Sequence, residues 1–263
     1  MLGAMIGDIA GSRFEWDNIK TKDFKLLHPV CRMTDDSIMT LAVAKAILES
    51  RETGSDLGQE AVRWMQKLGR RFPYAGFGGH FRRWLTDPNP RPYGSYGNGA
   101  AMRVSPAGFA ASSLEEAKAL SRAVTEVTHN HPEGIKGAEA TACIIYLART
   151  GKTKEEIRSF VREHYYPLDF TLDEIRPAYT FDVSCQGSVP QAIEAFLEST
   201  DFEDAIRNAV SIGGDSDTIA AIAGGMAEAF YGIPGALREK ALGYVRDGEL
   251  LAILRDFEAA FPG

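Results

Sequence analysis

The sequence predicts an all-α fold, and three observations lead to this prediction. Apolar residues recur at three- and four-residue steps through much of the chain, strand signals are weak, and no stretch reads as an interdomain linker. The composition, 44% hydrophobic and 25% charged, is ordinary for a globular protein, and 263 residues suffice for a large core. We therefore expect residues 1–263 to form a single domain of packed helices.

Helical periodicity is clearest over residues 218–231, where apolar residues at positions 219, 222, 223, 226 and 230 share one face. Further helices are predicted at 37–50, 61–68, 114–127, 135–147, 193–197, 202–210 and 237–257. Residues 179–183 alternate weakly between apolar and polar, and the stretch is too short to predict a strand. Long loops should therefore join the helices and carry functional residues.

The charge of the chain argues against general binding to nucleic acid. Lys and Arg number 29 and Asp and Glu number 36, a net charge of −7, whereas phosphate-backbone binding needs clustered cations. No apolar run approaches the roughly 20 residues that span a bilayer, and the N-terminus lacks the basic start of a secretory signal. Cys31, Cys143 and Cys185 form no disulfide or zinc pattern. We expect no nucleic-acid or membrane partner and a cytoplasmic location.

Two acidic segments each precede a predicted helix, with Asp35 and Asp36 in one and Asp215 and Asp217 in the other. Either segment alone could serve as an N-cap, because Asp caps helices well and negative charge suits a helix N-terminus. Together they hold more carboxylates than two caps require, and crowded like charges need a cation. Oxygen ligands favour Mg²⁺, Mn²⁺ or Ca²⁺. If the two helix starts face each other, their carboxylates suit a two-metal site.

The N-terminal segment offers a third acidic contribution. We expect Asp8 to be a helix cap or a buried hydrogen-bond acceptor. Glu15, which lies between Phe14 and Trp16, is open to two interpretations. It is either a surface residue or a carboxylate in a shielded site, where a raised pKa would suit acid–base catalysis.

The densest glycine signal is the loop at residues 93–99, which contains Gly94, Gly97 and Gly99. Glycines let the backbone approach a ligand closely, and successive N–H groups can form a nest for a diphosphate. Tyr96 could stack on a base and Asn98 could bond a polar ligand group, with a plain surface turn as the alternative. Residues 76–81 are also glycine-rich but lack a dinucleotide fingerprint, and we predict a loop there.

The histidines and cysteines predict neither a soft-metal site nor a thiol nucleophile. His129 and His131 form an H-x-H pair, but no third soft ligand lies nearby in the sequence. Hydrogen bonding by His129, or turn packing, is therefore favoured over metal ligation. Cys185 has no base partner in the sequence, and the other three histidines are predicted to be structural or surface residues.

Five segments, in this order, resemble the ADP-ribosylglycohydrolase family. They are residues 7–15 (GDIAGSRFE), 34–37 (TDDS), 94–103 (GSYGNGAAMR), 128–132 (THNHP) and 213–218 (GGDSDT). The last is the most specific, and the likeness covers nearly the whole chain. The resemblance implies a compact, orthogonal helix bundle with a dinuclear Mg²⁺ or Mn²⁺ centre. Ser37 stands where many relatives have threonine, and we expect its hydroxyl to cap the helix.

The resemblance also implies roles for individual residues. The implied metal ligands are Thr34, Asp35 and Asp36 on one side and Asp215, Asp217 and Thr218 on the other. Glu15 would lie beside the metals near the scissile bond, and Glu15, Asp36 and Asp217 form the expected catalytic set. ADP-ribose would be held by Gly94, Ser95, Tyr96, Gly97, Asn98 and His129, with the diphosphate on loop N–H groups and adenine on Tyr96.

The implied activity is hydrolysis of the N- or O-glycosidic bond between ADP-ribose and a protein side chain or another acceptor, releasing ADP-ribose. Paired cations could clamp ribose hydroxyls and activate water at an oxocarbenium-like transition state. The alternatives are a catalytically silent ADP-ribose-binding relative and a Mg²⁺-dependent hydrolase of another nucleotide-sugar-like substrate. A prenyl-diphosphate enzyme is disfavoured, because its motif has a third carboxylate where this chain has Met39. The linkage, the metal, the general base and the oligomeric state stay open.

Overall fold

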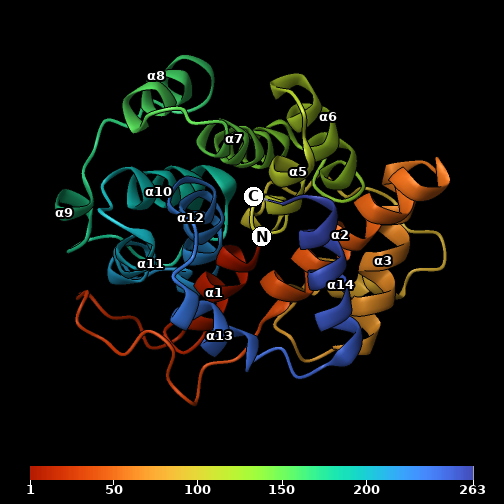
Figure 1. Cartoon of the computed structure of the whole chain (residues 1–263), viewed down its shortest axis with the longest axis horizontal. Coiled ribbons are helices and arrows are strands. Elements are labelled where there is room, and N and C mark those ends of the chain that lie inside the picture. The colour runs from red at the N-terminus through yellow and green to blue at the C-terminus, as the bar shows by residue number, and fades with distance from the viewer. Residues whose placement is uncertain (263) are drawn as a thin grey trace.

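The computed structural model describes residues 1–262 and is built from helices (Figure 1). Within these residues fourteen α-helices and one 3-10 helix are joined by loops, and no strand forms. The helices are α1 (Leu2–Gly11), α2 (Asp35–Thr53), α3 (Leu57–Arg71), α4 (Gly79–Thr86), η1 (Asn98–Ala100), α5 (Ser105–Ala110), α6 (Leu114–Thr125), α7 (Pro132–Arg149), α8 (Lys154–His164), α9 (Leu172–Ile175), α10 (Cys185–Leu197), α11 (Phe202–Ser211), α12 (Ser216–Tyr231), α13 (Gly235–Leu242) and α14 (Gly248–Ala260). The all-α prediction is confirmed.

Several predicted elements differ from the structure. The segment predicted at 193–197 is the end of α10, which begins at Cys185, and α8 was not predicted. Residues 237–257 were predicted as one helix, but they divide into α13 and α14 because Asp247 caps α14 by accepting from the N–H groups of Glu249 and Leu250. The loop predicted at 76–81 is also wrong in part, since α4 begins at Gly79. Residues 179–183 form no strand. The next residue, Ser184, makes an isolated bridge with Gly97.

Helix α1 has no counterpart among the helices predicted from periodicity. All ten of its residues are buried, so it has no polar face and hence no amphipathic pattern to detect. It packs along α12 near the centre of the molecule, red beside blue in Figure 1. A Cβ on Gly7 would lie 1.9 Å from the Ala220 carbonyl oxygen, and one on Gly11 would lie 2.5 Å from the Cα of Asp217. The two helices therefore meet backbone to backbone.

Several of the remaining helices pack against α2 or α12. Helices α3, α5 and α14 pack against α2, while α7, α10 and α11 pack against α12. Helix α1 contacts both α2 and α12, and one hydrophobic core draws on elements from α1 to α14. The starts of α2 and α12 are thereby brought to the same region. Of the helices formed by residues 1–262, none combines the length and apolar character needed to cross a membrane.

Candidate active site

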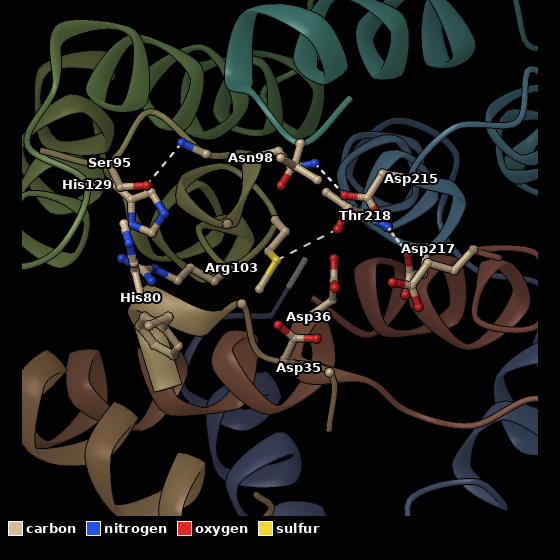
Figure 2. Close-up of a pocket in the computed structure, with 18 of the residues that line it drawn as sticks. Asp35, Asp36, His80, Ser95, Asn98, Arg103, His129, Asp215, Asp217 and Thr218 are labelled. Atoms are coloured by element: carbon tan, nitrogen blue, oxygen red, sulfur yellow. Dashed lines mark hydrogen bonds between the residues drawn. The ribbon is translucent and has the colours of Figure 1, made fainter. Parts of the chain in front are cut away.

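A pocket of about 490 Å³ opens between the starts of α2 and α12 (Figure 2). Its volume falls within the roughly 300–1,000 Å³ usual for small-molecule sites. One wall consists of carboxylates, which we call the acidic cluster: Glu15, Asp35, Asp36, Asp215 and Asp217. The opposite wall carries nitrogen-bearing side chains and part of the glycine loop, including His80, Arg103 and His129.

The two acidic segments converge, which is the condition that the two-metal hypothesis required. Carboxylate oxygens of Glu15, Asp215 and Asp217 lie within 4.8 Å of one another, and so do those of Asp8, Asp36 and Asp217. Figure 2 shows Asp36, from α2, directed toward the start of α12. Asp215 occupies the N-cap position of α12, but its side chain makes no capping hydrogen bond. Capping therefore does not account for this carboxylate.

The acidic cluster gathers carboxyl groups that, among residues 1–262, no Lys or Arg of the pocket wall pairs with. Burial and neighbouring carboxylates raise the pKa of Asp35 to about 7 and raise the pKa values of Asp36 and Asp217 well above the ordinary range. Within residues 1–262, Arg103 is the one Lys or Arg in the pocket wall, and it bonds a backbone carbonyl and a threonine hydroxyl rather than a carboxylate. In the part of the chain that the structure describes, Asp36 Oδ1 is buried and has no hydrogen-bond partner. These residues fit a hard divalent cation.

Asp8 lies next to the acidic cluster and supports the start of α2 through hydrogen bonds. Its carboxylate accepts from the Thr34 N–H at 2.9 Å, the Thr34 hydroxyl at 2.6 Å, the Ser37 N–H at 3.1 Å and the Ser37 hydroxyl. The prediction of a buried acceptor is confirmed. The capping role predicted for Ser37 is wrong, because its hydroxyl donates to Asp8 and the N-cap of α2 is Thr34.

Glu15 and Thr218 both lie in the pocket wall. Glu15 is half-buried, and burial together with the charge of Asp215 raises its pKa. Of the two interpretations left open by the sequence, this position supports the shielded carboxylate. The Thr218 N–H donates to Asp217 Oδ1 at 3.0 Å, and its hydroxyl lies 3.9 Å from the sulfur of Met102.

The glycine loop matches its predicted role only in part. Ser95, Gly97 and Asn98 line the pocket together with His129, whereas Gly94 and Tyr96 are not among the lining residues. The Tyr96 ring is half exposed and lies with its centroid 5.2 Å from that of His131. A base stacked on this ring would therefore lie outside the pocket.

Three N–H groups of the loop already donate hydrogen bonds within the protein. The N–H of Gly94 donates to the Asn130 side chain at 2.8 Å, that of Gly97 to Ser95 Oγ at 3.2 Å, and that of Asn98 to a backbone carbonyl at 2.7 Å. An anion nest built from these three groups is therefore not what the structure shows, because internal acceptors occupy them. The Asn98 amide likewise donates to Asp215 Oδ2 at 2.7 Å and so orients the acidic cluster.

Sequence reasoning missed several residues of the pocket. Gly76, His80 and Phe81 belong to the segment predicted as a loop without a ligand role, and all three line the pocket. Arg103 was given no role, although a charged residue directly after the apolar run Ala-Ala-Met was an available signal. Its side chain is almost fully buried, at 1% exposure.

Gly76 shapes the position of Asp35. Its φ of +131° is a conformation that side chains rarely adopt, and a Cβ there would lie 2.5 Å from Asp35 Oδ1. We predict that Gly76→Ala displaces the Asp35 carboxylate and weakens Mg²⁺ or Mn²⁺ binding about 10-fold or more. Gly54→Ala is the matched control, since Gly54 has a φ of +72° and no neighbour within 4 Å. Calorimetric titration with each metal checks this, and equal affinities in the two variants would contradict it.

Comparison with known proteins identifies the family of this chain. The sequence model of the ADP-ribosylglycohydrolase family matches residues 1–262. The chain belongs to this family. It is a family of glycosidic hydrolases, and the resemblance drawn from the five segments is confirmed.

Individual relatives extend over most of the chain. Human "ADP-ribosylhydrolase ARH3" is 25% identical, over 93% of this chain and 88% of its own length. "ADP-ribosylarginine hydrolase Tri1" of Pseudomonas putida (strain GB-1) is 28% identical, over 89% and 70%. "ADP-ribosyl-[dinitrogen reductase] glycohydrolase" of Rhodospirillum rubrum is 25% identical, over 77% and 70%. A solved "ADP-ribosylglycohydrolase-related protein complex" shares the fold, with a TM-score of 0.62 at 24% identity, covering 97% of this chain and 96% of that one.

Proposed function

We propose that this protein hydrolyses the glycosidic bond between ADP-ribose and an acceptor, with two divalent cations, Mg²⁺ or Mn²⁺. The observation that carries the proposal is the acidic cluster. Two helix starts bring carboxylates together there, and one buried oxygen of Asp36 has no hydrogen-bond partner within the described part of the chain. The names of two relatives specify ADP-ribosylarginine and ADP-ribosyl-[dinitrogen reductase], which favours a modified protein side chain as the acceptor.

The residues that would hold the cations come from the starts of α2 and α12. They are Thr34, Asp35, Asp36, Asp215, Asp217 and Thr218. Thr34 is buried, and its hydroxyl donates to Asp8 and accepts from the Asp36 N–H, which leaves one lone pair on the oxygen for a cation. When bound, such cations supply Lewis acidity, which polarises substrate oxygens and makes water more acidic.

Glu15 is the group that we assign to proton transfer. Its raised pKa lets the carboxyl group hold a proton at a higher pH than an ordinary glutamate would. It can give that proton to the leaving atom of the acceptor, or take one from the attacking water, as the bond to the ribose breaks through an oxocarbenium-like transition state. Asp36 and Asp217 complete the proposed catalytic set from α2 and α12.

The rest of ADP-ribose would extend from the acidic cluster toward the opposite wall. Ser95, Gly97, Asn98 and His129 line the pocket there. Because the Gly94 N–H already donates to the Asn130 side chain, Gly94 would act through the shape of the loop. Tyr96 offers its half-exposed ring on the outside, where an adenine leaving the pocket could stack.

The decisive experiment measures ADP-ribose release from peptides carrying arginine-, serine- or otherwise-linked ADP-ribose, in Mg²⁺, Mn²⁺ or EDTA. We expect release from at least one linkage and its loss in EDTA, because the acidic cluster cannot act on a sugar without cations. Binding of ADP-ribose without any release would instead identify a silent relative. If the protein neither binds nor releases ADP-ribose, the proposal is overturned, and the substrate would be another nucleotide-sugar-like compound.

A further inference from the structure

His129 faces the pocket from the wall opposite the acidic cluster. Its side chain is buried, and its Nε2 atom lies 3.3 Å and 3.6 Å from the points where Cβ atoms of Gly99 and Gly97 would stand. Within residues 1–262, the hydrogen bond that this ring makes is through Nδ1, to the Thr128 hydroxyl at 2.7 Å. Nε2 is therefore the ring nitrogen available to a ligand.

The direction of hydrogen bonding at Thr128 decides which ring nitrogen carries the proton. Arg103 Nη2 donates to Thr128 Oγ1 at 2.6 Å, and a guanidinium group has only donors. The hydroxyl therefore accepts from Arg103 and keeps one proton to donate. Two acceptors compete for it, His129 Nδ1 at 2.7 Å and the Thr125 carbonyl at 3.4 Å. The shorter contact is much the stronger hydrogen bond.

We infer that Arg103 and Thr128 are positioning residues that hold His129 as the neutral tautomer protonated on Nε2, ready to donate to an oxygen of bound ADP-ribose. This inference rests on the proposed function for the identity of the ligand. Only the donation from Arg103 to Thr128 has a fixed direction. The direction from Thr128 to His129 is part of the inference, and it rests on the 3.4 Å distance to the Thr125 carbonyl, which leaves Nδ1 at 2.7 Å as the better acceptor for the hydroxyl proton.

The surroundings of His129 agree with a neutral ring. Burial, and then the charge of Arg103, hold the pKa of His129 well below its usual value. Burial lowers the pKa of Arg103 only to about 10, so the guanidinium stays charged near pH 7. The lone pair of Nδ1 therefore remains available to Thr128, and the ligand meets a hydrogen-bond donor that adds no charge.

The test uses the full chain labelled with ¹⁵N, in Mg²⁺, and compares wild type with Thr128→Val and Thr128→Ser. Long-range proton–nitrogen spectra distinguish a protonated ring nitrogen from an unprotonated one. We expect a proton on Nε2 in wild type and in Thr128→Ser. In Thr128→Val, which keeps the shape but loses the hydroxyl, we expect both tautomers and an ADP-ribose affinity about 3- to 10-fold weaker, the range for one neutral hydrogen bond.

The outcomes separate this inference from the proposed function. A proton on Nδ1 in a wild-type protein that binds ADP-ribose would overturn the inference and leave the proposed function standing. A proton on Nε2 in a protein that binds no ADP-ribose would contradict the proposed function and support the tautomer. If Thr128→Val had wild-type spectra and affinity, Thr128 would lose its positioning role. The wild-type spectrum is sufficient to decide the tautomer. The inference therefore stays testable even if a variant fails to fold.

Discussion

Asp36→Asn and Asp217→Asn should each reduce metal-dependent release of ADP-ribose by more than about 100-fold, since even the outer partners of metal ligands are worth about 10–100-fold. Each change replaces a carboxylate oxygen at the point where α2 and α12 meet. The fold should survive, because the amide has the same shape and relieves repulsion among buried like charges. kcat/KM on the responsive linkage is the first measurement.

The second measurement for these variants is thermal stability with and without metal. Cations that bind only the folded state raise the melting temperature of wild type. Both variants should lose that rise while melting in EDTA at or above the wild-type temperature. Asp169→Asn is the matched control, since Asp169 is exposed and does not line the pocket. Full activity in either variant would refute the assignment of the acidic cluster as the reaction centre.

Gly7→Ala should destabilise the protein by at least about 2 kcal/mol, toward the upper part of the range for overpacked cores. The added methyl group would lie 1.9 Å from the Ala220 carbonyl oxygen and 2.7 Å from the Ala221 nitrogen, so α1 and α12 would have to separate. This cost exceeds the roughly 1 kcal/mol by which alanine favours a helix over glycine. For a chain of this size it corresponds to a fall in melting temperature of about 4–8 °C.

Separation of α1 from α12 should also disturb the site, because Asp8 lies in α1 and Asp217 in α12. We therefore expect Gly7→Ala to lose part of the stabilisation by Mg²⁺ or Mn²⁺. Gly248→Ala makes the same substitution at the first residue of α14, where nothing lies within 4 Å of the new Cβ. It should change stability by no more than about 1 kcal/mol. Equal melting temperatures for the two variants would contradict the close contact of α1 with α12.

The candidate site was predictable where residue type carried the information. Adjacent carboxylates at two helix starts indicated a hard-cation site, and Asp217 does meet Asp36 on one side and Asp215 on the other. The glycine loop was harder, because a pattern of glycines does not say whether its N–H groups are free. In the folded chain Asn130 and Ser95 occupy two of those groups. The resemblance to known enzymes did not reveal this, because it compares residue identities. Residue identities do not show which groups are hydrogen-bonded to each other.

The sequence alone determined the all-α class, most of the longer helices, the family and the residue types of the acidic cluster. Periodicity reports the buried face of a single helix, so it missed α1, which is buried on every side. Only the tertiary structure decided that α1 brings α2 and α12 together, that Asp8 supports Thr34 and Ser37, and that Arg103 lies behind His129. These facts depend on which faces meet across distant parts of the chain, and local sequence patterns contain no such information.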